Sequence, residues 1–164
     1  MSARDHSFDH SFDHSFDHSF DHSFDHSFDT AVLDIDGTLL DSTYHHTVAW
    51  ARAFDAVVDR HVPVFAIHRA IGMGGDRLVA EVAGEEVEER YGDAIRDRWK
   101  KEYDEVIDRT ALFDGARELL DGLQQRGLEV VLASSSIPEH AQHALDLLDA
   151  ERRADAATTS EDAE

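Results

Sequence analysis

The sequence predicts an α/β fold: a Rossmann-like parallel sheet, incomplete with three strands expected, and an inserted α-helical cap. The first observation is a set of short apolar runs that end in polar residues, at 31–34, at 128–133 and, more weakly, at 154–159. The second is that the chain between the first two runs shows only helical periodicity. A helical unit inserted between two strands of a parallel sheet accounts for both.

The first apolar run, 31–34, delivers two carboxylates to one end of the predicted sheet. Alternation along a strand places Asp34 and Asp36 on one side and Ile35 on the other. Ligands of open α/β sheets bind at the carboxyl ends of the strands, where both acids emerge. Two neighbouring carboxylates repel each other unless a cation lies between them or one holds a proton. Mg²⁺, which takes oxygen ligands, fits that need.

The segment from about residue 42 to 114 predicts the helical cap. We expect a first helix to about Arg60, with Asp41 or Ser42 as its cap. A short helical piece follows the break at 61–63. The flexible loop Ile71–Asp76 then leads into a helical segment that ends near Gly84. A long helix is expected from Glu85 to about Arg109. The aromatic residues of its apolar stripe are interpreted as cap core rather than as a cofactor site; the stripe is Val87, Tyr91, Ile95, Trp99 and Tyr103.

The chain after the cap predicts alternating helices and strands. Gly115 opens a helix that Gly127 ends, as a glycine after the last helical residue often does. The second strand, 128–133, follows. Ser136 and Glu139 have the spacing of a capping box, with Pro138 in the first turn of a helix that runs to about Asp149. The third strand, 154–159, comes last.

The segment Asp34-Ile-Asp-Gly-Thr-Leu-Leu-Asp-Ser42 resembles the first motif of the haloacid dehalogenase-like hydrolases. The order of elements is similar to that of family members with a small helical cap, including phosphoglycolate phosphatases and β-phosphoglucomutases. The resemblance covers about residues 29–164. It implies a phosphomonoester hydrolase in which Asp34 attacks a small phosphorylated metabolite and forms an aspartyl-phosphate. It also implies that Asp36 is the general acid/base, and that the Asp34 carboxylate and the Asp36 backbone carbonyl hold Mg²⁺. Dehalogenases of the family lack the second Asp, so Asp36 favours phosphate esters.

The resemblance extends to further candidate site residues. Ser134, with Ser135, matches the second motif, which hydrogen-bonds the phosphoryl group at a helix N-terminus; a simple polar turn is the alternative. His46 matches a proton-relaying histidine of the mutase-like branch, although it could be a surface or capping residue. The cap loop with Arg69 and Asp76 is the candidate for substrate selection, or else a hinge. Gly75 stands where the mutases have a phosphate-gripping Arg, which favours a phosphatase over a mutase.

Two family motifs have no match in the sequence. A Lys is expected roughly 30 residues after the second motif, and a pair of acids after the next strand. The last Lys is Lys101, and Glu161 and Asp162 follow the third strand too early to be the metal acids. We therefore expect a chain truncated at its C-terminus, inactive or very weak alone and marginally stable. The alternatives are an inactive remnant or non-catalytic binding module, and a metal-binding protein that functions through its His-rich repeat.

The composition excludes several classes of protein. The formal net charge of -21, from 36 acidic and 15 basic residues, disfavours nucleic acid and anionic membranes as partners. Acidity with only two Lys is typical of halophilic proteins. There is no cysteine, no apolar run long enough for a membrane span and no signal peptide, so we expect a cytoplasmic protein. A monomer is expected unless a missing C-terminal segment completes the chain.

The amino-terminal region is six copies of Asp-His-Ser-Phe over residues 5–28. Neither a helix nor a strand places its apolar residues on one face with a partner, so a disordered tail over 1–29 is expected. The predicted organisation is then this tail, a core formed by 30–41 and 115–164, and a cap formed by 42–114.

Overall fold

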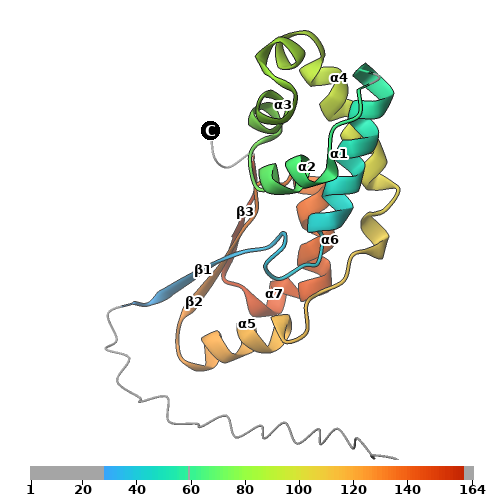
Figure 1. Cartoon of the computed structure of the whole chain (residues 1–164). Helices are drawn as coiled ribbons and strands as arrows, with labels where there is room; N and C mark the ends of the chain where they lie inside the picture. Colours follow the sequence, from blue (N-terminus) through green and yellow to red (C-terminus); the bar gives the residue numbers. More distant parts are fainter. Residues whose placement is uncertain (1–27, 59, 161–164) are drawn as a thin grey trace, which may run out of the picture.

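The computed structural model describes residues 28–58 and 60–160 and contains a parallel sheet of three strands (Figure 1). The strands are β1 (Thr30–Asp34), β2 (Glu129–Ala133) and β3 (Ala156–Thr158), in the order β1-β2-β3. Val32 pairs with Val131, which in turn pairs with Ala156. The predicted α/β class and three parallel strands are therefore confirmed. The prediction for the tail falls on residues 1–27, outside the described part of the chain.

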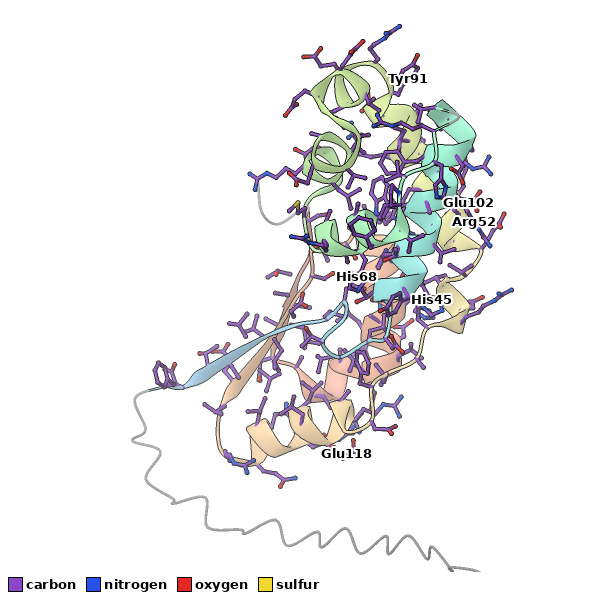
Figure 2. The ribbon with its side chains drawn as sticks, viewed as in Figure 1. His45, Arg52, His68, Tyr91, Glu102 and Glu118 are labelled. Atoms are coloured by element: carbon purple, nitrogen blue, oxygen red, sulfur yellow. The ribbon has the colours of Figure 1, made fainter. Side chains whose placement is uncertain are left out.

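Four helices follow β1 and form a bundle beyond the carboxyl end of the sheet (Figure 1). They are α1 (Thr43–Val58), α2 (Val64–Ala70), α3 (Gly75–Ala83) and α4 (Glu85–Asp104). Predicted as one helix to Arg109, the last segment instead ends at Asp104 and is followed by the 3-10 turn η1 (Ile107–Arg109). Helix α1 packs along α4, and the buried Glu102 of α4 accepts hydrogen bonds from Arg98 and Arg52 (Figure 2).

The chain re-enters the core beside the point where it left. The Asp41 N–H donates to the Ala111 carbonyl at 2.8 Å, and the Phe113 N–H donates to the Leu39 carbonyl at 3.0 Å. The segments 39–41 and 111–113 therefore run antiparallel. They place the points at which the chain enters and leaves the bundle next to the carboxyl end of β1. The bundle is thereby held over the end of the sheet at which the motif acids emerge.

Three helices of the second half cover one face of the sheet (Figure 1): α5 (Ala116–Gln125), α6 (Pro138–Leu148) and α7 (Ala150–Arg153). The predicted capping box at Ser136 is wrong. The N-cap of α6 is Ile137, without a side-chain cap, because the Ser136 hydroxyl donates to a carboxylate at the end of β1 instead. Helix α7 was not expected from the sequence; Asp149, with a φ of 54°, turns the chain between α6 and α7.

The buried apolar side chains form two separate clusters. One lies within the α1–α4 bundle around Phe54, Ile67 and Ile95, and the other lies between the sheet and its helices around Leu120 and Leu132. Ile95, Val87 and Trp99 of the predicted stripe belong to the cluster of the bundle, whereas Tyr91 is 39% exposed. Within the described residues, none of the helices combines the length and apolar character that crossing a membrane requires.

Candidate active site

Asp34 lies at the carboxyl end of β1 and is exposed to solvent. Its Oδ2 accepts a hydrogen bond of 2.8 Å from the Thr38 hydroxyl. Thr38 can reach back because Gly37 turns the chain with a φ of 77°, and a Cβ at Gly37 would lie 2.5 Å from the Thr43 hydroxyl oxygen. The Gly-Thr pair of the motif therefore both bends the chain and orients the exposed carboxylate.

Asp36 is held by four side chains, two that follow it closely in the chain and two from the loop after β2. Its Oδ1 accepts hydrogen bonds from the Ser42 hydroxyl at 2.8 Å and from His46 Nε2 at 3.3 Å. Its Oδ2 accepts from the Ser134 hydroxyl at 3.1 Å and from the Ser136 hydroxyl at 2.8 Å. Each carboxylate oxygen thus accepts two hydrogen bonds, and these four bonds fix the orientation of the carboxylate.

The environment of Asp36 favours its ionised form. Burial raises the pKa of the carboxyl, but the hydrogen bond and charge of His46, together with the bonds from Ser42 and Ser136, outweigh burial. The net result is a pKa well below the usual range of an aspartate. At neutral pH this side chain is a carboxylate, and His46 Nε2 must carry the hydrogen that it shares with Asp36.

Aromatic rings from α4 hold the imidazole of His46 in place. The ring of Tyr103 stacks on His46 with centroids 3.9 Å apart and an interplanar angle of 9°. The ring centroid of Trp99 lies 5.7 Å from that of His46. Tyr103 is 1% exposed, and burial followed by the charge of Asp36 raises the pKa of its hydroxyl. The phenol therefore stays neutral, and its ring acts as a rigid support for His46.

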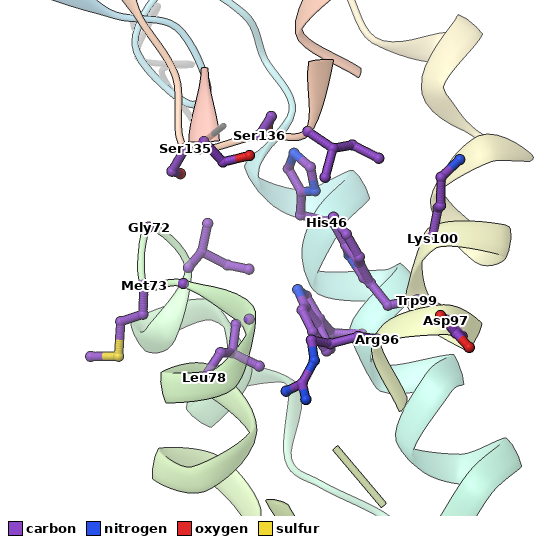
Figure 3. A pocket seen from close by; sticks show the side chains of 16 residues that line it. His46, Gly72, Met73, Leu78, Arg96, Asp97, Trp99, Lys100, Ser135 and Ser136 are labelled. Carbon is purple, nitrogen blue, oxygen red and sulfur yellow. The ribbon is translucent and has the colours of Figure 1, made fainter. Parts of the chain in front are cut away.

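A cavity of about 410 Å³ opens between the bundle and the carboxyl end of the sheet (Figure 3). Ser135 and Ser136 lie at one end of the cavity, next to the first turn of α6. His46 and Trp99 line one side, and the segment from Ile71 to Gly75 lines another. The cavity and the Asp36 cluster share His46 and Ser136, so a molecule in the cavity would border the carboxylate site.

The predicted site residues differ in how the structure places them. Asp36, Ser134 and His46 come together, although the Ser134 hydroxyl points at Asp36 and accepts a 3.0 Å bond from the Ser136 N–H. Asp34 lies opposite Ala133 in the sheet, and its side chain is bonded to Thr38. Ser135 is exposed at the cavity end. Arg69 and Asp76 are exposed and do not line the cavity; their role in substrate selection stays a prediction.

Sequence reasoning missed three contributors to the site. Ser42 and Ser136 were assigned to helix caps, and Tyr103 to the interior of the bundle. The hydroxyl of Ser136 reaches a residue 100 positions away along the chain, and this contact has no signature in the local sequence. The only available signal was the run of three serines after a buried strand.

The donor atoms suit a hard divalent cation but do not complete its coordination. The exposed Asp34 carboxylate and the Asp36 backbone carbonyl are oxygen ligands of the kind that Mg²⁺ takes, and this ion commonly fills its other positions with water and substrate phosphate. Within residues 28–58 and 60–160, no three His, Asp or Glu side chains gather as a metal-binding group. The two donors therefore fit a weakly held Mg²⁺.

The comparison with known families identifies the chain. The model of the haloacid dehalogenase-like hydrolases matches residues 28–164. The chain belongs to this family. The match includes the motif strand, the helical bundle and both later strands, so the family resemblance of the sequence is confirmed. Among curated protein sequences, none matches the chain significantly.

Solved structures of this family share the fold. A hydrolase from Pseudomonas syringae is 27% identical with a TM-score of 0.73, over 81% of this chain and 61% of its own. A predicted phosphoglycolate phosphatase from Haemophilus somnus is 17% identical with a TM-score of 0.67, over 82% of this chain and 63% of its own. A predicted phosphatase from Clostridium acetobutylicum is 20% identical with a TM-score of 0.67, over 81% and 62%. The chain thus spans less than two thirds of the length of these relatives.

Proposed function

We propose that this haloacid dehalogenase-like chain carries the phosphoryl-transfer centre of a phosphomonoester hydrolase that depends on Mg²⁺ and forms an aspartyl-phosphate on Asp34. The observation that carries the proposal is the contrast between two neighbouring carboxylates. Asp34 is exposed and bonded to Thr38 alone among the described residues, whereas Asp36 is fixed by four donors. One is free to attack, and the other is positioned to manage protons.

In the first step, an oxygen of Asp34 attacks phosphorus while the bond from phosphorus to the leaving oxygen breaks. The leaving oxygen needs a proton, which Asp36 delivers. Because the pKa of Asp36 is low, the carboxyl must receive that proton from a neighbour. In the proposed step the imidazolium form of His46, whose Nε2 lies 3.3 Å from Asp36, gives up the proton and becomes a neutral imidazole. Mg²⁺, when bound by Asp34 and the Asp36 carbonyl, would neutralise charge on the phosphoryl oxygens.

In the second step, a water molecule attacks the phosphorus of the aspartyl-phosphate, and the bond from phosphorus to Asp34 breaks. Asp36, which is ionised at neutral pH, takes the proton of the attacking water and passes it to His46, which restores the starting protonation of the pair. Inorganic phosphate leaves and Asp34 is regenerated. Ser135 and the first turn of α6 offer a hydroxyl and backbone N–H groups to the phosphoryl oxygens during both steps.

The environment of Gly75 favours a phosphatase over a phosphoglucomutase-like enzyme. A Cβ at Gly75 would lie 3.2 Å from Cδ of Arg96, so the Arg96 side chain occupies this corner of the cavity. Its guanidinium, however, donates to Glu88 at 2.8 Å and to Asp93 at 2.7 Å. A cation that is already paired in this way is poorly suited to grip a second phosphate.

The test is phosphate release from p-nitrophenyl phosphate with and without Mg²⁺. We expect slow, Mg²⁺-dependent turnover, since the described residues supply few metal ligands. Asp34→Asn should lower the rate by on the order of 10³-fold or more, because the nucleophile is lost. Asp41→Asn, an exposed Asp seven positions along the same motif, is the matched control and should retain the rate. Undiminished turnover by Asp34→Asn would refute the proposal, because another group would then have to accept the phosphoryl group. A wild-type chain without Mg²⁺-dependent turnover would instead favour the non-catalytic binding module.

A further inference from the structure

The walls of the cavity between the bundle and the sheet allow the substrate class to be narrowed. We infer that the cavity takes the leaving group of a phosphate monoester with an uncharged aromatic body, rather than a phosphorylated carboxylic acid or a bisphosphate. This inference rests on the proposed function, because it assigns the phosphoryl group to the Ser135 end of the same cavity. It goes beyond that function by specifying what the remaining volume holds.

The size of the cavity is the first argument. At about 410 Å³ it lies within the range of roughly 300–1,000 Å³ that is usual for pockets holding whole small-molecule ligands. The phosphoryl group occupies the end formed by Ser135 and Ser136. The volume that extends between Met73 and Trp99 remains for the leaving group (Figure 3). A two-carbon acid would leave most of this space to water.

The aromatic lining is the second argument. Trp50 and Trp99 stack with centroids 5.0 Å apart and an interplanar angle of 15°, and His46 lies nearly parallel to Trp99 at 23°. The three rings therefore form one stack, and all three residues line the cavity. Ile71, Met73, Leu78 and Ile137 add apolar surface elsewhere around the cavity. A flat apolar body gains most from such walls, through burial and through contacts between rings.

The charge balance of the cavity is the third argument. Arg96 is paired with Glu88 and Asp93, as described above. Lys100 Nζ lies 3.3 Å from Asp104 and 3.3 Å from Glu139. Arg96 and Lys100 thus each already face two carboxylates.

Asp97 adds a further negative charge to the lining. With the two cations already paired, the wall carries an excess of negative charge, in a chain whose formal net charge is -21. A second anionic group on the ligand would meet repulsion there. An uncharged body avoids this repulsion.

The two tryptophans of the chain, Trp50 and Trp99, both line the cavity, so intrinsic fluorescence reports its occupancy directly. The experiment titrates the full chain, with Mg²⁺, against three phosphonates that phosphatases do not hydrolyse: methylphosphonate, benzylphosphonate and phosphonoacetate. Benzylphosphonate should bind at least about tenfold more tightly than phosphonoacetate, since burial of a phenyl group is worth a factor of that order or more. The affinity for methylphosphonate measures binding at the phosphoryl end of the cavity alone.

Variants of Met73, which is 44% exposed at the cavity, make the assignment specific. Met73→Gln should weaken the binding of benzylphosphonate several-fold and leave the affinity for methylphosphonate unchanged. Met73→Lys adds an unpaired cation and should shift the preference toward phosphonoacetate. Val64→Gln is the matched control, since Val64 is 47% exposed on α2 and does not line the cavity. This variant should change the affinity for neither ligand.

Equal or tighter binding of phosphonoacetate by the wild-type chain would overturn the inference while leaving the proposed hydrolase intact. Absence of any response to all three phosphonates would overturn both the phosphoryl site and this inference. If the wild-type chain shows no turnover but still binds benzylphosphonate more tightly than phosphonoacetate, the result would support the inference and count against the catalytic proposal. Binding and catalysis are therefore tested separately.

Discussion

Asp36 is the residue that unites the site. Ser42 and His46 follow it closely in the chain, whereas Ser134 and Ser136 come from the loop after β2. A side chain that is 21% exposed and accepts four hydrogen bonds stabilises the fold as well as serving chemistry. Its carboxylate joins the two halves of the chain at the carboxyl end of the sheet.

Asp36→Asn should lower the free energy of unfolding by about 1–3 kcal/mol at pH 7, because an amide cannot accept all four hydrogen bonds. The folded-state pKa of Asp36 lies below its unfolded value, so the wild-type carboxylate contributes fully above the ordinary aspartate pKa of about 3.9. That contribution is lost as the pH falls from there toward the folded pKa. Urea unfolding at pH 7 and pH 3.5 should therefore show a smaller difference between wild type and variant at pH 3.5. An equal difference at both values would contradict this account.

The sequence was most informative about single residues of the first motif. The period of two and the apolar run located Asp34 and Asp36 at the end of a strand, and the layout located Ser134 beside them. The purpose of Ser136 could not be predicted, since its local spacing with Glu139 favours a cap. Only the approach of two loops distant in sequence makes the bond to Asp36 available. Likewise, periodicity marks Tyr103 as buried but does not indicate that its partner is a site histidine.

At the level of elements, contacts between α4 and α6 connect the bundle to the core. His140 on α6 is 5% exposed, and its Nε2 lies 2.7 Å from Asp104 at the end of α4. Lys100 adds a contact to Glu139 at 3.3 Å. The ring of His140 also meets Tyr103 edge-on at 4.8 Å, so this junction supports the aromatic stack behind His46. The position of the bundle and the geometry of the site are thus coupled.

The junction predicts a specific pH dependence of stability. Burial, together with the charges of Lys100 and His46, lowers the pKa of His140 by more than the hydrogen bond and charge of Asp104 raise it. The folded state therefore binds fewer protons than the unfolded state below the ordinary value of about 6.5. Stability should fall as the pH drops from 6.5 toward the folded pKa. In His140→Gln this contribution is absent. Between pH 7.5 and pH 5.5, we expect the wild type to lose more of its free energy of unfolding than the variant does, as measured by urea unfolding. Parallel losses would count against the buried neutral histidine.

At the level of the whole molecule, we propose that residues 42–114 form a cap and that residues 30–41 and 115–164 form the core. The two separate buried clusters support this division. Periodicity predicted the order of helices and strands, but not the end of α4 at Asp104 or the extra helix α7. The end of α4 depends on where the chain must turn to bring 111–113 back beside 39–41, which is a property of the packed molecule.

The sheet is covered unequally, and this predicts opposite outcomes for two valines. Val130 is fully buried against the helices, while Val32 is 67% exposed on the other face. Val130→Thr should lower the free energy of unfolding by about 1–3 kcal/mol, since a hydroxyl is buried in an apolar layer. Val32→Thr should change it by no more than about 0.5 kcal/mol. Thermal unfolding of both variants checks the contrast. A comparable loss in Val32→Thr would show that this face is covered in solution.

The central claim is that the Asp34 carboxylate is the group that accepts the phosphoryl moiety. Beryllofluoride, a stable mimic of a phosphoryl group that bonds to a carboxylate oxygen, tests this claim without requiring turnover. Fluorine NMR of the full chain with Mg²⁺ should show bound resonances in the wild type and in Asp41→Asn, and none in Asp34→Asn. Bound resonances that persist in Asp34→Asn, or that are absent from the wild type, would contradict the account.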